Sequence, residues 1–266
     1  MRHTAGGPAE DEAMADTVDL LGVPLDNLSR AEALERVAAL VRARRPSLVV
    51  TPNVDHLVNL QADPEFRLIY ARASLVLADG VPLLWAARFL GTPIREKLSG
   101  SDLFSDLCRL SAERGFRMFF LGGREGAAAR AAEVMCRAHP GLQVAGVYCP
   151  PFGFERDRSE CARIDAALTA ARPDILLVGL GSPKQEKWAD RNSERLGIPM
   201  TMGVGITFEY TAGMVQRAPR WMQRVGLEWM FRLAMEPGRL WRRYLLNDPK
   251  FFWYVLQQRF RGPRKP

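Results

Sequence analysis

Short apolar runs alternate with longer segments of helical periodicity up to about residue 212. The helical segments include residues 126–138 and 160–171, in which alanine and arginine recur at helical spacing. Regular alternation of strand, turn and helix is typical of a parallel sheet flanked by helices. We therefore predict a Rossmann-like α/β fold with a mostly parallel sheet. The expected strands are residues 47–50, 74–78, 116–121, 174–178 and 200–202.

Glycine and polar residues follow directly after each predicted strand. In an open parallel sheet, ligands bind beyond the carboxyl ends of the strands. The residues at these ends therefore form the candidate site of the protein. They are Thr51-Pro52-Asn53, Asp79-Gly80, Gly122-Gly123, residues 179–183 and residues 203–205.

The pattern changes at about residue 217, where tryptophan- and leucine-rich helical segments with interleaved arginine begin. Breaks at Pro237-Gly238 and at Pro249 predict two or three helices. The chain thus divides into a flexible extension, an α/β core that we expect to fold on its own, and a C-terminal helical appendage. The extension is acidic and lacks the apolar stretch of a secretory signal. The three parts are residues 1–17, 18–216 and 217–266.

Positive charge and aromatic residues concentrate in the appendage. Residues 217–266 hold 12 of the 37 Lys and Arg residues but only 3 of the 30 Asp and Glu residues, a net charge of +9 in a chain of net charge +7. The same segment holds 10 of the 24 aromatic residues, including four of the six tryptophans. Such clusters attract polyanions. The candidate partners are an anionic membrane face, a phosphorylated substrate and nucleic acid.

Composition and missing motifs exclude several classes of protein. The apolar fraction of 47% and the charged fraction of 25% are those of a globular protein, and no apolar run approaches the roughly 18 residues of a membrane span. Four dispersed cysteines and three scattered histidines form neither a disulfide framework nor a zinc site, which favours a reducing cytoplasm. GxGxxG, Walker A and Asp-x-Asp motifs are absent from the sequence, so we expect no dinucleotide cofactor and no metal.

Two strand ends carry candidate catalytic groups, each with a structural alternative. Asp79 can act as a general base, but Asp-Gly is also a common turn pair. Thr51 and Asn53 can hydrogen-bond a sugar or a base, whereas Pro52 between them can simply end a strand. For Thr51 and Asn53, spacing alone favours the structural explanation.

Two glycine-containing segments precede predicted helices. Residues 122–126 can bring backbone N–H groups close to a phosphate. In residues 181–186, Ser182 and Gln185 have the spacing of a capping box, while Lys184 and Gln185 can equally face the ligand crevice. Spacing leaves these two explanations open.

Arginines recur in the appendage at helical spacing. Arg232, Arg239 and Arg242 or Arg243 would share one face of a continuous helix, although Pro237 interrupts it. Charge runs are usually solvated faces, but the interleaved tryptophans indicate a surface that contacts a partner.

Eight segments, taken in order, resemble the WecG/TagA/CpsF family of bacterial glycosyltransferases. Each segment alone is a weak signal, but the set covers about Val18 to Tyr244 and ends in a long specific motif. The segments are TPNVDH, LADGVP, SGSDLF, FFLGG, PPFGF, GLGSPKQE, GVGITFEYTAG and RAPRWMQRVGLEWMFRLAMEPGRLWRRYL.

The resemblance implies an inverting enzyme that moves a sugar from a UDP-sugar to a polyprenyl-diphosphate-linked sugar. Such enzymes act in surface-polysaccharide synthesis as peripheral proteins on the cytoplasmic face of the bacterial inner membrane. No cofactor is implied, an anionic membrane surface is the expected partner, and a homo-oligomer stays open. The donor sugar and the acceptor sugar are not determined by the sequence.

The resemblance also assigns roles to individual residues. Asp79 is the implied base, with Thr51 and Asn53 beside it. Implied substrate-binding residues are Gln185 and Lys184 of the PKQE motif, Lys97 and Asp102 around the x-Gly-x-Asp motif, Glu209, Arg232, Arg239 and Arg242. Lys97 and Glu209 depart from the commoner Arg and Asp of the family, which would change a bidentate phosphate contact to a point charge and lengthen a carboxylate by one methylene.

Two alternatives come from other classes of protein. A nucleic-acid-binding or nucleotide-binding α/β protein without transferase activity fits the pI of 9.6 and the basic appendage. The slightly acidic core and the lack of a recognisable nucleic-acid module disfavour nucleic acid as a partner. An NAD-dependent oxidoreductase is disfavoured by the missing dinucleotide motif.

Overall fold

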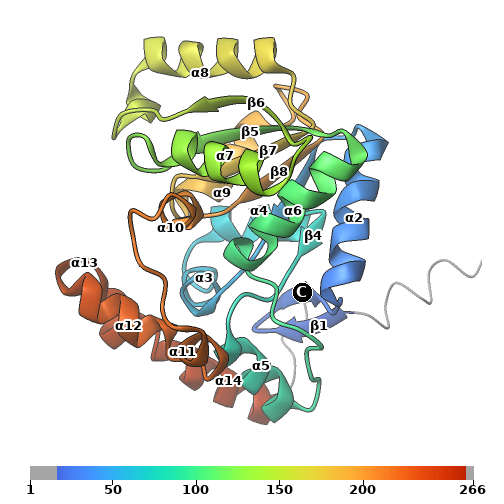
Figure 1. Ribbon diagram of the computed structural model, residues 1–266. Helices are drawn as coiled ribbons and strands as arrows, with labels where there is room; N and C mark the ends of the chain where they lie inside the picture. The colour runs from blue at the N-terminus through green and yellow to red at the C-terminus, as the bar shows by residue number, and fades with distance from the viewer. Residues whose placement is uncertain (1–16, 262–266) are drawn as a thin grey trace, which may run out of the picture.

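The computed structural model describes residues 17–261 and contains a six-stranded sheet (Figure 1). The strand order is β4-β3-β8-β7-β5-β6, and all neighbouring pairs are parallel. The predicted parallel α/β sheet is therefore confirmed. The strands are β3 Ser47–Val50, β4 Leu75–Val76, β5 Arg117–Gly122, β6 Gln143–Tyr148, β7 Ile175–Gly179 and β8 Met200–Gly203.

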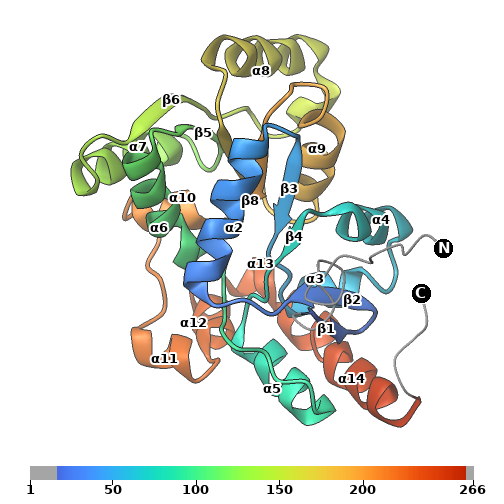
Figure 2. The same cartoon turned by 90° about the vertical axis from the view of Figure 1, so that its right-hand side faces the viewer.

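Helices cover both faces of this sheet (Figures 1 and 2). One face carries α2 Arg30–Ala43, α6 Gly100–Arg114 and α7 Ala127–Ala138. The opposite face carries α3 Val54–Asn59, α4 Pro64–Arg72, α8 Arg158–Ala171 and α9 Lys184–Asn192. The short helices η1 Phe154–Arg156 and α10 Thr207–Thr211 lie in the loops after β6 and β8.

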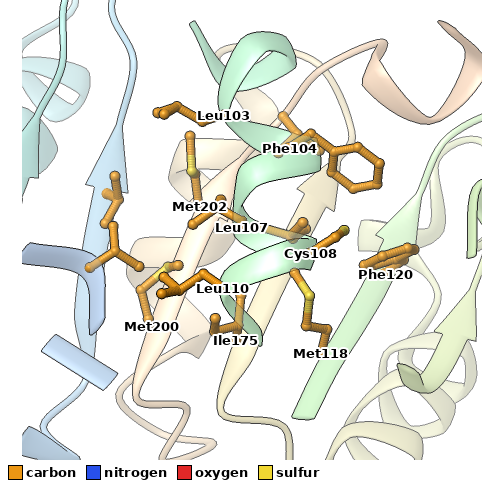
Figure 3. Packing of buried hydrophobic residues seen from close by; sticks show 14 of the residues in the cluster. Leu103, Phe104, Leu107, Cys108, Leu110, Met118, Phe120, Ile175, Met200 and Met202 are labelled. Carbon is orange, nitrogen blue, oxygen red and sulfur yellow. The ribbon is translucent and has the colours of Figure 1, made fainter. Parts of the chain in front are cut away.

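The strands are apolar on both faces because each face is covered. In β5, Met118 and Phe120 belong to the hydrophobic cluster under α6, while Phe119 and Leu121 pack on the side of α8. Figure 3 shows Leu107 and neighbouring side chains of α6 packed over the first of these faces. This two-sided burial explains why the central strands were recognisable as continuous apolar runs.

Two sheet elements were not predicted. The antiparallel hairpin of β1 Thr17–Leu20 and β2 Val23–Asp26 turns at Leu21 and Gly22, which have φ of 58° and 80°. Both positive angles fit a tight hairpin turn. The edge strand β6 was missed because its residues are only half-buried and include Gly146, so it lacks an apolar run. The expected extension at residues 1–17 lies outside the described residues, except that Thr17 begins β1.

The appendage gathers at one end of the molecule, beside α5 Val81–Leu90 (Figure 1). The expected number of two or three helices is wrong, because Gly226 at φ 71° adds a break before α12 and a π-helix follows α13. Helices do begin at Pro237 and after Pro249, as predicted. The elements are α11 Arg220–Arg224, α12 Glu228–Met235, α13 Pro237–Trp241, the π-helix η2 Arg242–Asn247 and α14 Lys250–Arg261.

The last helix, α14, packs into the body of the protein. Phe251 and Val255 are buried in the hydrophobic cluster that contains the β1–β2 hairpin, α3 and α5. Gln258 accepts a hydrogen bond from the backbone N–H of Leu21 at 2.8 Å and donates to the Asp19 backbone carbonyl at 3.2 Å. The end of the appendage therefore completes the packing of the first strands.

Candidate active site

A pocket of about 1080 Å³ lies at the carboxyl edge of the sheet and is shared with the appendage. Residues that follow β3, β4, β5, β7 and β8 line it, as the strand-end rule predicts. The predicted residues that line the pocket are Thr51, Asn53, Asp79, Lys97, Gln185, Glu209, Arg232 and Arg239. Asp102, Lys184 and Arg242 are not among the described residues that line it.

Asp79 lies three residues beyond β4, where the strand direction continues into the pocket. Its backbone N–H donates to the Pro52 carbonyl at 2.9 Å, which holds this strand end beside that of β3. Burial raises the pKa of the Asp79 carboxyl to about 7, while Lys97 and Arg217 partly oppose the rise. A carboxylate with a pKa near neutral pH can accept a proton efficiently.

Thr51 and Asn53 lie at the neighbouring strand end. Thr51 is buried, and Asn53 caps α3 by accepting a hydrogen bond from the His56 N–H at 3.2 Å. Asn53 also accepts from Arg243 Nη2 at 3.4 Å, so it has a structural role as well as a place in the pocket. His56 is bonded through Nδ1 to the Tyr70 hydroxyl at 3.0 Å, and burial lowers its pKa to about 3. This histidine is therefore neutral at physiological pH.

Glycines allow the strand ends and Gln185 to approach each other closely. A Cβ at Gly203 would lie 2.4 Å from the Gln185 side chain, and a Cβ at Gly179 would lie 2.9 Å from the Phe208 ring. Gln185 Oε1 accepts from the Gly205 N–H at 3.1 Å, while its Nε2 donates to Glu186 at 2.8 Å. The glycines thus place the Gln185 amide in the wall of the pocket.

The capping box considered for residues 182–185 does not form. Helix α9 begins after Pro183 and has no side-chain cap. Lys184 points to Glu155, with Nζ 2.5 Å from Oε1 and 5.0 Å from the centre of the Phe152 ring. Of the two residues expected to face the crevice, Gln185 does so and Lys184 is held in an ion pair outside it.

Glu209, on α10, is 6% exposed and lines the pocket. One carboxylate oxygen accepts from the backbone N–H of Arg124 at 2.8 Å, which ties α10 to the glycine loop after β5. Within residues 17–261, the second oxygen is buried and has no hydrogen-bond partner. This oxygen can accept a hydrogen bond from a ligand.

Lys97, Asp102, Arg217 and Glu228 form a chain of charges along the pocket. Asp102 is held in the first turn of α6 by the Ser99 cap, and it binds Lys97 at 2.5 Å and Arg217 at 2.7 Å. Arg217 lies 3.5 Å from Glu228, the first residue of α12. The two cations lower the pKa of Asp102 to about 2. Asp102 is therefore not itself among the pocket-lining residues but binds two that are, Lys97 and Arg217.

Four arginines of the appendage line the pocket, but only two of the three predicted are among them. Arg232 and Arg239 do so, while Arg242 lies outside with its guanidinium 5.3 Å from the Trp241 ring centre. Arg243 takes the expected place of Arg242. Arg243 rather than Arg242 faces the pocket because the helix is interrupted at Glu236 and continues as the π-helix η2. Both features rotate the side-chain positions away from those of a continuous α-helix.

Arg243 is anchored to the core by acidic and amide side chains. Its Nε lies 3.6 Å from Asp55 and 3.9 Å from Asp248. Burial raises the pKa of Asp248 to about 7. A second tie lies on the other side of the pocket, where Glu236 binds Arg124 at 2.9 Å and also Arg239.

A family model described as the glycosyl transferase WecG/TagA/CpsF family matches residues 18–265. The chain belongs to this family. The resemblance stated from the eight sequence segments is thereby confirmed, and the protein is a glycosyltransferase of the WecG/TagA/CpsF family.

Several similar proteins carry one name, N-acetylglucosaminyldiphosphoundecaprenol N-acetyl-beta-D-mannosaminyltransferase. The relative from Bacillus spizizenii is 31% identical, over 83% of this chain and 82% of its own. The relative from Bacillus subtilis is 28% identical over 74% and 73%, and that from Staphylococcus aureus strain MW2 is 24% identical over 92% and 94%.

The WecG/TagA/CpsF site contains charged residues that the sequence did not single out, namely Arg217, Glu228 and Asp248, and Arg243, which was named only as an alternative to Arg242. Arg217 and Arg243 lie inside the motif RAPRW…RRYL, so the segment was recognised but not the orientation of its side chains. Among the helices of residues 17–261, none has the length and apolar character needed to cross a bilayer. In the same range, no three His, Cys, Asp or Glu side chains are grouped as metal ligands.

Proposed function

We propose that the protein is an inverting glycosyltransferase that moves a sugar from a UDP-sugar to a polyprenyl-diphosphate-linked sugar. The observation that carries this proposal is the Asp79 carboxylate, with a pKa of about 7, in a pocket that Arg232, Arg239 and Arg243 also line. A base and a group of cations are what transfer between two diphosphate-bearing substrates requires. The printed names of the relatives specify a diphosphoundecaprenol-linked N-acetylglucosamine acceptor and a mannosaminyl group, which support these substrate classes.

In the proposed reaction, a hydroxyl oxygen of the acceptor sugar attacks the anomeric carbon of the donor. Asp79 takes the hydroxyl proton as the new C–O bond forms, and the bond to UDP breaks with its electron pair on the phosphate oxygen. One direct displacement of this kind inverts the anomeric configuration. Thr51 and Asn53, one strand away, have the hydrogen-bonding groups to orient the sugar.

The departing diphosphate gains negative charge, which cations and backbone N–H groups stabilise. Arg232, Arg239 and Arg243 can supply the cations. We therefore expect the reaction to proceed without an added metal ion.

A membrane-bound acceptor requires the pocket to lie close to a lipid surface. Helices of the appendage and α5 expose large apolar side chains, including Trp85, Trp221, Trp241, Phe252 and Trp253. Tryptophan and phenylalanine settle at the headgroup level of a bilayer, and basic residues add attraction to anionic lipid. We infer a peripheral location on the cytoplasmic face of the bacterial inner membrane, in surface-polysaccharide synthesis.

A panel of UDP-sugars tests this function. Each donor is incubated with a short-chain polyprenyl-diphosphate-linked N-acetylglucosamine, with and without excess EDTA, and the release of UDP and the anomeric configuration of the product are measured. We expect one donor to be used and the product to be inverted, with most of the rate retained in EDTA. Retention of configuration, or no transfer from any donor, would overturn the proposal. Rate lost in EDTA and restored by Mg²⁺ or Mn²⁺ would overturn its metal-independent part.

A further inference from the structure

Two cations next to the pocket are both bound to a single carboxylate, Asp102. Lys97 Nζ contacts one Asp102 oxygen at 2.5 Å, and Arg217 Nη2 donates to the other at 2.7 Å. The exposed fractions of the Lys97, Asp102 and Arg217 side chains are 21%, 14% and 24%. Solvent and salt screen such part-buried pairs less than fully exposed ones.

Asp79 shares the pocket with the same two cations but pairs with neither. Within residues 17–261, its side chain has no ion pair and no hydrogen bond, although Lys97 and Arg217 are close enough to affect its pKa. Lys97 and Arg217 favour the charged carboxylate, while Glu228 and Asp102 disfavour it. The titratable groups around Asp79 are Tyr70 of α4, Lys97 of the loop before α6, Asp102 of α6, Arg217 of the segment before α11 and Glu228 of α12.

Asp102 itself is fixed by the local structure of α6. Its backbone N–H donates to Ser99 Oγ at 3.1 Å, which places it in the first turn of the helix. Ser99 is buried, so the cap is protected from water. A carboxylate fixed in this way can hold two mobile cations at defined positions.

We propose that Asp102 is a positioning residue that holds Lys97 and Arg217 away from Asp79 and so leaves the Asp79 carboxylate free to take a proton. The inference rests on the proposed function and adds a residue to it. A carboxylate that is bound to a cation is a weaker base, because its charged form is stabilised. With Asp102 as the preferred partner, the cations stay in the pocket for a polyanionic substrate and lower the basicity of Asp79 less than a direct ion pair would.

The first test is the pH dependence of kcat/KM for Asp102→Asn. Lys97 and Arg217 lose their partner and pair with Asp79, so we expect the acidic limb to move down by one pH unit or more and kcat to fall about tenfold. Asp102→Glu keeps a carboxylate and should keep the limb near its native position. Asp106→Asn is the matched control, because Asp106 is on the same helix and binds Arg30 at 3.2 Å and Arg109 at 3.8 Å outside the pocket.

A double-mutant cycle separates positioning from a simple loss of charge. Lys97→Met is measured in the native and the Asp102→Asn backgrounds. Lys97→Met should move the acidic limb of the kcat/KM profile to higher pH in both backgrounds. If Asp102 holds Lys97 away from Asp79, this upward shift is larger in the Asp102→Asn background by one pH unit or more. Equal shifts in the two backgrounds would overturn the proposal. Asp102→Ser serves as the second uncharged variant if Asp102→Asn does not fold.

A measurement without substrate separates this inference from the proposed function. The carboxyl carbon of Asp79 is followed by NMR as pH is varied, and its signal is assigned by its loss in Asp79→Asn. We expect the Asp79 midpoint to be lower in Asp102→Asn than in the native protein. An unchanged or higher midpoint would refute the positioning role. If the native protein transferred no sugar, the proposed function would be refuted. The titration of Asp79 would still decide whether Asp102 has the positioning role.

Discussion

At the residue scale, the catalytic role proposed for Asp79 comes with a cost in stability. Its pKa of about 7 in the folded protein exceeds the ordinary value of 3.8, so the folded state binds the proton more tightly than the unfolded state. The free energy of unfolding therefore falls as pH rises from about 4 to about 7. Above about pH 7 the folded protein carries a poorly solvated negative charge at Asp79. A neutral amide at this position would lower the free energy of unfolding less.

The first prediction is that Asp79→Asn lowers turnover and raises stability. Without the base, kcat should fall by about two to four orders of magnitude. In urea unfolding, the variant should equal the native protein at pH 4 and exceed it by up to about 4 kcal/mol at pH 8. Near-native turnover would refute the base, and an equal stability difference at the two pH values would refute the raised pKa.

The second prediction compares two adjacent arginines. Arg243 lines the pocket and is anchored by Asp55, whereas Arg242 lies over the Trp241 ring. Arg243→Ala should therefore lower turnover at least tenfold more than Arg242→Ala, measured at saturating substrate with both variants folded by circular dichroism. The reverse order would mean that the appendage rearranges when substrate binds.

The candidate site was predictable where it follows from strand ends and not where it depends on the appendage. Asp79 and Thr51 come directly after apolar runs, so the sheet rule located them, whereas spacing left the place of Gln185 open. Arg217 and Arg243 reach the pocket through local breaks and contacts with residues more than a hundred positions away. Periodicity carries no information on such contacts.

At the element scale, predictability followed burial. The recognised strands β3, β4, β5, β7 and β8 consist mostly of buried residues, whereas the half-buried β6 and the β1–β2 hairpin were not recognised. The same principle corrects the expectation for the appendage. Because α14 buries Phe251 beside the hairpin, we now expect the chain shortened to residues 1–216 to lose stability.

The third prediction uses two neighbouring phenylalanines of α14. Phe251 is fully buried and Phe252 is 54% exposed. Phe251→Ala should lower the free energy of unfolding by about 3–5 kcal/mol, while Phe252→Ala should change it by less than about 1 kcal/mol. Urea unfolding of both variants is the measurement. Equally small effects of the two variants would mean that the packing of α14 contributes little to the stability of the core.

At the scale of the whole molecule, exposed apolar side chains and positive charge coincide at the appendage. Trp221 and Trp253 are each 61% exposed, on segments that carry most of the net positive charge. A surface that is both apolar and basic binds anionic lipid through two additive contributions. Residues of α5 and of the appendage helices also line the pocket, which is the arrangement that the proposed lipid-linked acceptor requires.

The fourth prediction concerns this surface. The double variant Trp253→Ser and Phe252→Ser should reduce co-sedimentation with anionic vesicles at least fivefold, because both side chains are exposed on α14. Leu68→Ser is the control, since Leu68 is 52% exposed on α4, away from the appendage. Binding should also weaken as salt is raised. A native protein that does not sediment with vesicles would contradict the peripheral location.

The contact between Gln258 and Leu21 joins positions 237 residues apart and has a consequence for biosynthesis. The β1–β2 hairpin is translated early, yet the part of its cover that α14 supplies is made last. At about 5–20 residues per second, the hairpin waits roughly 10–50 s on the ribosome. During that interval it presents an unprotected strand edge to other nascent chains. Yield in a cell should therefore depend on chaperones that bind the beginning of the chain until its last helix arrives.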